Sequence, residues 1–368
     1  MRQARYSTVL LLMITAVLQG CSTLAYYSQA IGGHLQVMQQ ARPVDTYLAD
    51  SQTPERLRAK LSLALQIREF ASRELGLPDN GSYRRYADLG RPYVLWNVFA
   101  APAFSVKPVE SCFPIAGCVD YRGWYSEAAA QRAAQALQAQ GFDTFIGGVP
   151  AYSTLGWFDD PLLNTFISFP DYELARLIFH ELAHQLVYVR NDSTFNESFA
   201  VVIEEEGLRR WFARLGAGAA VGAGELSRYE SARARRREFI ALMLECRARL
   251  AQLYAQNIGE EEKRIGKGRL LQALEADYQR LKSSWDGFAG YDRFFAQGVN
   301  NAMLASIATY NEKVPAFRFL LTRENGDLPA FLRVVREYAQ MPRAARDTVL
   351  QEISASVVTS PSSLVNAN

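Results

Sequence analysis

The amino-acid sequence predicts an α+β fold that is mostly helical, with one strand-rich segment between two helical regions. Residues 22–77 have the length and the Ala, Gln and Glu content of helices. About 65 residues from Tyr93 onward are rich in strand-forming side chains and are divided by proline and glycine. Beyond residue 171 almost every window follows a helical pattern. A chain of 368 residues can bury the core of one large domain or two fused domains.

The strand-rich segment contains four predicted strands and one helix. Pro92 and Pro102 bound the first strand, and Ser126 is a suitable N-cap for an alanine-rich helix that ends before Gly141. We predict strands at residues 93–101, 119–125, 142–147 and 151–157, and the helix at 126–140.

The remainder of the chain is predicted to be helical up to a short tail. Six helices are predicted near residues 171–189, 195–214, 224–256, 259–284, 294–311 and 328–339. The last ten residues are rich in Ser and Asn, which is typical of disorder. We therefore divide the chain into a signal peptide (1–20), a helical N-terminal segment (21–90), a core segment (91–215), a large helical C-terminal lobe (216–358) and a disordered tail (359–368).

The first 20 residues have the features of a secretory signal. Arg2 and Arg5 precede an apolar stretch at residues 9–18, which is shorter than the roughly 20 residues that a membrane-spanning helix needs. Gly20 and Cys21 resemble the end of a bacterial lipoprotein signal, so we expect cleavage and acylation at Cys21. Ser22 favours sorting to the outer membrane. The expected location is the bacterial cell envelope, lipid-anchored at the periplasmic face of the outer membrane; cleavage without a lipid and an uncleaved anchor are the alternatives.

An exported chain lies in an oxidising compartment, where cysteine pairs form disulfides. Cys112 and Cys118 are six residues apart, with Pro114 and Gly117 supplying a turn between them. We predict a disulfide between these two cysteines. Cys246 falls in an apolar helical pattern and is predicted to be a buried free thiol.

The overall charge does not favour a nucleic-acid partner. The chain has 40 basic and 38 acidic side chains, for a net charge of +2, so no global field attracts a polyanion. The densest basic cluster is RARRRE at residues 233–238. We interpret it as a solvated helix face rather than a binding patch.

The sequence His180-Glu181-x-x-His184 carries the clearest chemical signal. Residues four apart on a helix differ by about 40° around the axis and by about 6 Å along it, so both imidazoles can reach one metal ion. Glu181 projects beside the pair, where its carboxylate can take a proton from water. The alternative is a helix with two hydrogen-bonded histidines and a solvated glutamate.

A catalytic zinc site normally has three protein ligands and one open position. The third histidine, His34, is remote in sequence and is interpreted as a surface or packing residue. A carboxylate is therefore the expected third ligand. Twelve residues separate Glu197 from His184, including a turn in which Asp192 or Ser193 could cap the next helix. Glu204, seven residues further on, is the second candidate.

These motifs resemble those of a known group of enzymes. HELAHQ at 180–185 followed by FNESFA at 195–200 is similar to the gluzincin branch of metallopeptidases, whose second zinc helix carries an Asn-Glu pair. More closely, the chain resembles a bacterial family described as predicted aminopeptidases, usually lipoproteins. The similarity covers most of the mature chain and includes residues 96–98, 113–118, 121–125, 151–161 and the two zinc motifs.

The resemblance implies a zincin-like core in segment 91–215, with a small mixed sheet beside the HExxH helix and the cleft between sheet and C-terminal lobe. It implies one Zn²⁺ ion and a peptide substrate. Two features depart from well-known gluzincin aminopeptidases: the spacing from His184 to Glu197 is shorter, and no Gly-x-Met-Glu-Asn segment is present. An endopeptidase therefore stays open.

Further residues are expected to complete the site. Hydrolysis by such enzymes needs an oxyanion stabiliser, and Tyr310 is the first candidate because it lies in a polar break of an apolar helix; Tyr188 and Tyr152 are alternatives. Residues Tyr152, Ser153, Thr154 and Leu155 are predicted to bind substrate as an edge strand. Asp159, Asp160 and the glutamates at 204–206 could hold a substrate α-ammonium group, although a turn is favoured for Asp159-Asp160-Pro161.

The sequence thus predicts a zinc-dependent peptidase, with His180, His184 and Glu197 as metal ligands and Glu181 as general base. An aminopeptidase is favoured. An envelope endopeptidase and a non-catalytic zinc-binding lipoprotein scaffold are the alternatives.

Overall fold

The computed structural model describes residues 26–113, 117–216 and 220–359. The predicted signal peptide, the acylation site Cys21 and the tail beyond residue 359 lie outside the described residues. None of the described helices is long and apolar enough to cross a membrane. The described chain is mostly helical with small sheets, as an α+β fold requires.

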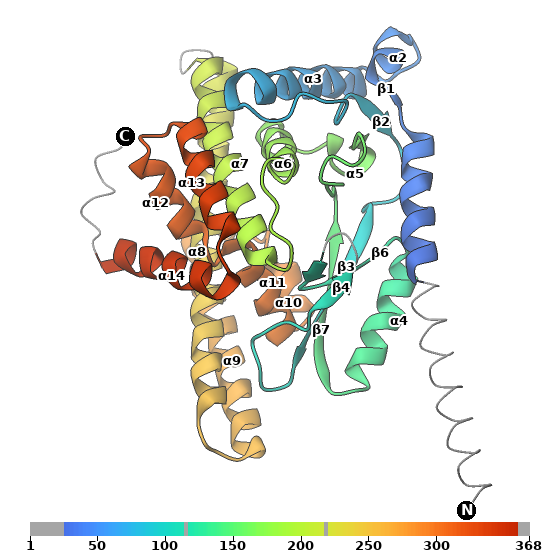
Figure 1. The fold of residues 1–368 in the computed structure, drawn as a ribbon. Helices are drawn as coiled ribbons and strands as arrows, with labels where there is room; N and C mark the ends of the chain where they lie inside the picture. The colour runs from blue at the N-terminus through green and yellow to red at the C-terminus, as the bar shows by residue number, and fades with distance from the viewer. Residues whose placement is uncertain (1–25, 114–116, 217–219, 360–368) are drawn as a thin grey trace, which may run out of the picture.

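The N-terminal region forms three helices, of which α2 and α3 lie along one end of the molecule and the first runs down one side (Figure 1). Residues 26–40 are helical. They are followed by β1 (Arg42–Pro43), α2 (Val44–Ala49) and α3 (Glu55–Leu75). Gly76 ends α3 in the left-handed conformation, with φ of 66°. The buried side chains of α3 include Leu61, Ala64, Ile67 and Phe70, which follow one another every three residues on one face.

The largest sheet is antiparallel, with strand order β6-β3-β7. Its strands are β3 (Leu95–Pro102), β6 (Arg122–Trp124) and β7 (Phe142–Val149). Alternate side chains of β3 point to opposite faces, as the pleat requires. Trp96 and Val98 pack against α4 (Glu127–Gln138), whereas Phe99 and Ala101 pack against α11 (Asn301–Asn311).

Two smaller sheets complete the β structure. The first is mixed: β2 (Arg85–Ala87) pairs antiparallel with β1 and parallel with β8 (Leu162–Leu163). The second is a hairpin of β4 (Ser111–Phe113) and β5 (Gly117–Val119), in which a disulfide joins Cys112 and Cys118.

Two of the strand predictions are corrected by the structure. The predicted strand at 119–125 is divided between β5 and β6. The predicted strand at 151–157 is wrong, because these residues form a loop. Leu155 and Gly156 adopt φ values of 57° and 82°, which turn the chain, and the carboxylate of Asp160 accepts a hydrogen bond from the N–H of Thr154.

Helices α6 and α7 form the centre of the molecule. The short α5 (Asn164–Ile167) precedes α6 (Asp171–Ala183), and α7 (Ser193–Leu215) follows after a turn. Helix α6 ends at Ala183, earlier than the predicted end at residue 189. Asp192 caps α7, since its side chain accepts a 3.0 Å hydrogen bond from the N–H of Phe195.

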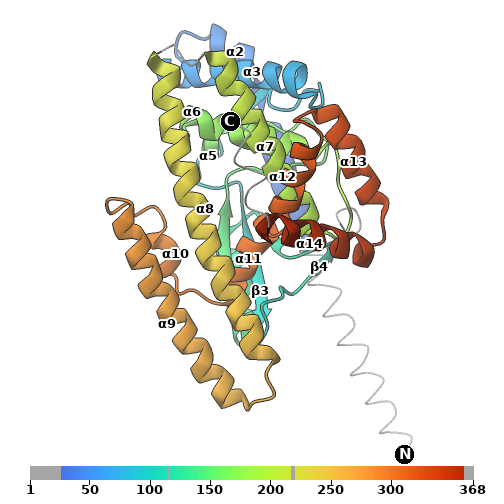
Figure 2. The same ribbon diagram turned by 90° about the vertical axis from the view of Figure 1, so that its left-hand side faces the viewer.

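The C-terminal lobe begins with two long antiparallel helices, α8 (Ala220–Ala255) and α9 (Glu260–Ser284), which lie side by side (Figure 2). The helix predicted at 294–311 is interrupted. Helix α10 (Asp292–Ala296) ends before Gly298, which has φ of 77°, and Asn300 caps α11. Three further helices follow: α12 (Val314–Arg323), α13 (Leu328–Gln340) and α14 (Arg343–Thr359).

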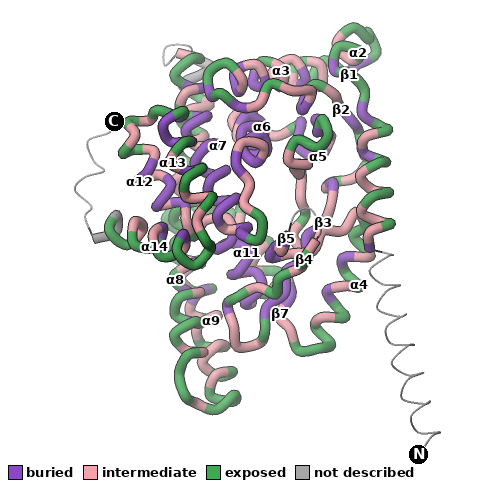
Figure 3. The backbone as a smooth tube through the Cα atoms, in the orientation of Figure 1, coloured by how far each residue is buried: buried purple, intermediate pink, exposed green. Residues whose placement is uncertain are grey.

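The described residues form one large apolar core and three smaller clusters beside it. A single buried cluster runs from Val37 to Leu350 and includes side chains of α3, α6, α7 and α12. Buried residues are concentrated on α6, α7 and α11, at the middle of the molecule (Figure 3). Any polar group on the inner faces of these helices therefore lies away from bulk water and needs a partner.

Candidate metal centre

Three potential metal ligands meet between α6 and α7. His180 is in the last turn of α6, His184 is at its C-terminal cap, and Glu197 is in α7. One ligand atom from each residue lies within 4.8 Å of the other two, and all three residues are buried. The structure therefore brings together the three ligands that the sequence predicts.

The turn between the helices is held by the residue that precedes Glu197. The side-chain oxygen of Asn196 accepts a 2.7 Å hydrogen bond from the N–H of Val189, and its amide nitrogen donates a 2.8 Å bond to the carbonyl of the same residue. These two hydrogen bonds close the turn between Val189 and Asn196. It fixes the start of α7 and with it the position of Glu197 relative to α6.

The spacing of the ligand atoms fits a single small cation. Oε2 of Glu197 lies 3.2 Å from Nε2 of His180 and 3.7 Å from Nε2 of His184. Ligand atoms of a tetrahedral zinc ion, at about 2.0–2.2 Å from the metal, are roughly 3.3–3.6 Å apart. Two imidazoles and one carboxylate are also the donor set of many catalytic zinc sites.

The electrostatics of the three groups favour a cation among them. Burial lowers the pKa of His184 to about 4, so its imidazole is neutral at pH 7 and has a lone pair to donate. Burial opposes ionisation of Glu197, but the adjacent His184 and His180 hold its pKa below the ordinary value. Burial disfavours the charged form of His180, but Glu197 and Glu204 outweigh this effect and raise the pKa of His180 to about 10. A metal ion bound here would replace that proton.

Glu204 lies behind His180 rather than among the ligands. Its Oε2 is 2.8 Å from Nδ1 of His180 and 2.8 Å from Nη1 of Arg176. The side chain is 1% exposed, and the guanidinium of Arg176 outweighs burial and holds the pKa of Glu204 at about 2. A carboxylate that accepts the Nδ1 proton leaves Nε2 of the same ring free for a metal. Glu204, the second candidate for a ligand, thus acts as the residue that orients His180.

Glu181 is a buried carboxylate next to His180. Burial raises its pKa to about 7, with His180 acting to lower the pKa and Glu197 and Asp160 to raise it. A carboxylate whose pKa is near the working pH can both accept and return a proton. Its position in the same helical turn as His180 places it beside the ligands.

Comparison with known proteins assigns the chain to a family. A family model described as Putative aminopeptidase matches residues 25–350. The chain belongs to this family. No curated protein and no solved structure matches it. Membership of the Putative aminopeptidase family supports a peptidase that acts on peptide substrates.

Several tyrosines surround the carboxylates of this aminopeptidase-family site. Burial raises the pKa of Tyr310 well above its ordinary value, and the nearby Glu197 and Glu181 raise it further. The same causes act on Tyr121, which sequence reasoning did not select as a site residue. Burial and Glu197 also raise the pKa of Tyr188. These phenols are therefore protonated at neutral pH, and a protonated phenol can donate a hydrogen bond to an oxyanion.

Tyr152 is placed differently from these tyrosines. Its hydroxyl is 2.7 Å from Nδ1 of His34, and its pKa is raised by burial and by Tyr125. His34 is thus a packing residue that contacts Tyr152 and Phe158.

The loop that contains Tyr152, Ser153, Thr154 and Leu155 is near the metal ligands but is not a strand. A Cβ added to Gly156 would lie 3.6 Å from the side-chain oxygen of Gln185, the residue after His184. Residues 152–155 are therefore not an edge strand, and their contact with substrate stays a prediction. The positive φ of Leu155 prevents a regular ladder at this point.

The sequence identifies the helix faces on which Arg176 and Glu204 lie, but not the contacts that the two residues make. Arg176 precedes His180 by four residues, and Glu204 follows Glu197 by seven, so each lies on the ligand face of its helix. These spacings identify the faces that meet. They do not show that Glu204 passes behind the ring of His180 instead of reaching the ion.

The orientation of His180 can be tested with Glu204→Gln. We expect the variant to bind zinc about 10–100-fold more weakly, because the amide is a poorer acceptor for Nδ1–H and leaves Arg176 without its partner. Affinity is measured by competition with a coloured chelator. Glu205→Gln is the matched control, since Glu205 pairs with Arg318 and does not touch His180. Equal zinc affinity in wild type and Glu204→Gln would contradict the assigned role.

Proposed function

We propose that this chain is a zinc-dependent peptidase in which His180, His184 and Glu197 hold the metal ion. The observation that carries the proposal is the convergence of these three buried side chains, with one ligand atom of each within 4.8 Å of the others. A bound Zn²⁺ ion would polarise the scissile carbonyl and make a water molecule more acidic. The donor set and the spacing of the ligand atoms support zinc over magnesium or calcium, which prefer oxygen ligands.

The residues of the chain supply the proton transfers. Glu181, with a pKa of about 7, takes a proton from the attacking water and returns it to the leaving amine as the peptide bond breaks. Tyr310 donates a hydrogen bond to the oxygen that develops negative charge. Besides burial, the charges of Glu197 and Glu181 raise the pKa of Tyr310, and this interaction with the site carboxylates supports the role.

An aminopeptidase requires an acidic group for the substrate's α-ammonium, and Asp160 is the candidate that the geometry favours. Its Oδ2 accepts the N–H of Thr154, whereas its Oδ1 is buried and has no hydrogen-bond partner among the described residues. Its charge also contributes to the raised pKa of Glu181. By contrast, Glu204, Glu205 and Glu206 are each paired with arginine.

The general-base role predicts that Glu181→Gln loses hydrolysis while keeping its metal. The amide cannot accept the proton of water, so kcat should fall by about 10²–10⁴-fold. Zinc content is measured on the same preparation by mass spectrometry. A variant that keeps both zinc and wild-type kcat would exclude Glu181 as the base, and a wild type that holds zinc but cleaves no peptide in a broad library would favour a non-catalytic scaffold.

The oxyanion role predicts a loss of about 10²–10³-fold in kcat for Tyr310→Phe, with little change in KM, because the hydrogen bond forms mainly in the transition state. Tyr121→Phe is measured in parallel, since the same two carboxylates, Glu197 and Glu181, raise the pKa of Tyr121. A loss confined to Tyr121→Phe would transfer the role to that residue.

The exopeptidase role of Asp160 predicts that Asp160→Asn raises KM at least tenfold for substrates with a free amino terminus. The reason is the loss of an ion pair with the α-ammonium group. Asp159→Asn, a change at the exposed neighbour, should leave KM unchanged. Cleavage of amino-terminally blocked peptides as fast as free ones would instead support an endopeptidase.

A further inference from the structure

A cavity lies behind the candidate metal centre, on the side of Glu204 that faces away from the proposed ligands. It has a volume of about 250 Å³ and lies between α6, α7, α8 and the segment around Tyr291. Six arginines and three glutamates are among the residues that line it: Arg176, Arg233, Arg235, Arg236, Arg237, Arg318, Glu173, Glu204 and Glu205. The cavity therefore has an excess of positive charge.

The cavity-lining arginines of α6 and α12 are already neutralised. Arg176 pairs with Glu173 at 2.7 Å and with Glu204 at 2.8 Å. Arg318 makes two hydrogen bonds to Glu205. These pairs use the three carboxylates of the lining, and only a 3.5 Å contact to Glu204 remains for Arg236.

The arginines of α8 are not balanced in this way. In the part of the chain that the structure describes, no carboxylate forms an ion pair with Arg233, Arg235 or Arg237. The Nε atoms of Arg233 and Arg235 are buried and have no hydrogen-bond partner among the described residues. The interpretation of residues 233–238 as a solvated helix face is thus incomplete, because Arg233, Arg235 and Arg236 are partly buried in the cavity wall.

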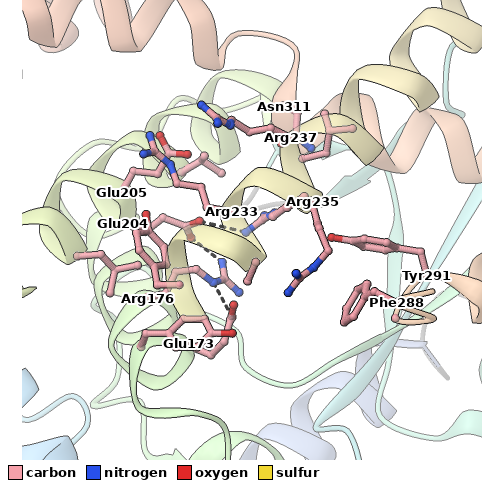
Figure 4. Close-up of a pocket in the computed structure, with 18 of the residues that line it drawn as sticks. Glu173, Arg176, Glu204, Glu205, Arg233, Arg235, Arg237, Phe288, Tyr291 and Asn311 are labelled. Atoms are coloured by element: carbon pink, nitrogen blue, oxygen red, sulfur yellow. Dashed lines mark hydrogen bonds and ion pairs between the residues drawn. The ribbon is translucent and has the colours of Figure 1, made fainter. Parts of the chain in front are cut away.

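The two sides of the cavity differ in character (Figure 4). The glutamates and Arg176 gather on one side, whereas Arg235 faces them from the other side with Phe288 and Tyr291. The guanidinium of Arg235 lies over the ring of Phe288, 4.3 Å from its centre, which holds the charge at the cavity. Buried donors without acceptors and unbalanced like charges are both unfavourable unless an anion compensates them.

We propose that this cavity binds a phosphate group through Arg233, Arg235 and Arg236, the partly buried arginines of α8 that line it. Guanidinium groups present paired N–H donors that match phosphate oxygens. The unpaired charge exceeds that of one carboxylate and suits a group with about −1.5 to −2 charges at neutral pH. The volume fits a small anion or a headgroup rather than a polymer. The proposal does not depend on the peptidase activity.

The test is calorimetric titration of inorganic phosphate into the full chain at constant ionic strength, with chloride as the reference anion. We expect one saturable site per chain. The double variant Arg233→Gln/Arg235→Gln should bind at least tenfold more weakly, and Arg233→Lys/Arg235→Lys should fall between the two because it keeps the charge but loses the paired donors. Arg249→Gln, a change at an exposed position of the same helix outside the cavity, should bind as wild type.

Two controls keep the result specific to the cavity. Zinc content is matched between proteins, because a metal ion at the first site could itself bind phosphate. Circular dichroism and melting curves establish that the variants are folded. No saturable heat beyond the chloride reference, or equal affinity in wild type and the double glutamine variant, would overturn the proposal.

The source of the phosphate group is distinguished by a vesicle arm. Vesicles with phosphatidic acid are compared with vesicles of phosphatidylcholine alone in a sedimentation assay. Retention on the former that depends on Arg233 and Arg235 assigns the site to a lipid headgroup. Phosphate binding in solution without such retention assigns it to a soluble phosphate compound.

Discussion

The packing of α6 against α7 is the constraint on which the site depends. The proposed ligands come from these two helices, and neither helix can move without separating them. Asn196 closes the turn between the helices, and the buried carboxylate of Asp192 caps α7. Asp192 also accepts a 2.7 Å hydrogen bond from Arg346 of α14, so the C-terminal lobe fixes the start of the second ligand helix.

Buried charge is balanced in layers around this helix pair. Glu204 accepts from His180 on one side and from Arg176 on the other, and its second oxygen faces Arg236. Breaking such a buried network costs several kcal/mol because a charge is left without a partner. Glu204 therefore lies between the candidate metal centre and the arginine-lined cavity and borders both. Arg236 contacts Glu204, and Glu204 contacts His180, one of the proposed metal ligands. An anion bound to Arg236 would therefore be linked to His180 through Glu204.

The parts of the site that are close in sequence could be predicted from the sequence. His180, Glu181, His184 and Glu197 span one helix, one turn and the start of the next helix, so helical geometry alone restricts their arrangement. The positions of β3 and β7 could likewise be anticipated from local composition and turns, but the predicted sheet is mixed, whereas β3 pairs antiparallel with both of its neighbours.

Other features depend on contacts that a linear pattern does not specify. The loop at residues 151–157 has strand-like composition, but the left-handed conformation of Leu155 and a bond to Asp160 turn it. Tyr121 approaches Glu197 only because the sheet and α11 bring distant segments together. The sequence of residues 233–238 suggests a helix face in contact with solvent. In the structure, α6, α7 and the segment around Tyr291 enclose part of that face.

The most direct test of the account is the zinc stoichiometry of purified protein, measured by mass spectrometry after equilibration with zinc and removal of excess metal. The account predicts one zinc ion per chain in wild type and a loss of tight binding in Glu197→Ala, with the fold retained. A metal-free wild type, or a Glu197→Ala variant that holds zinc as tightly as wild type, would contradict the claim that these two helices form a metal centre.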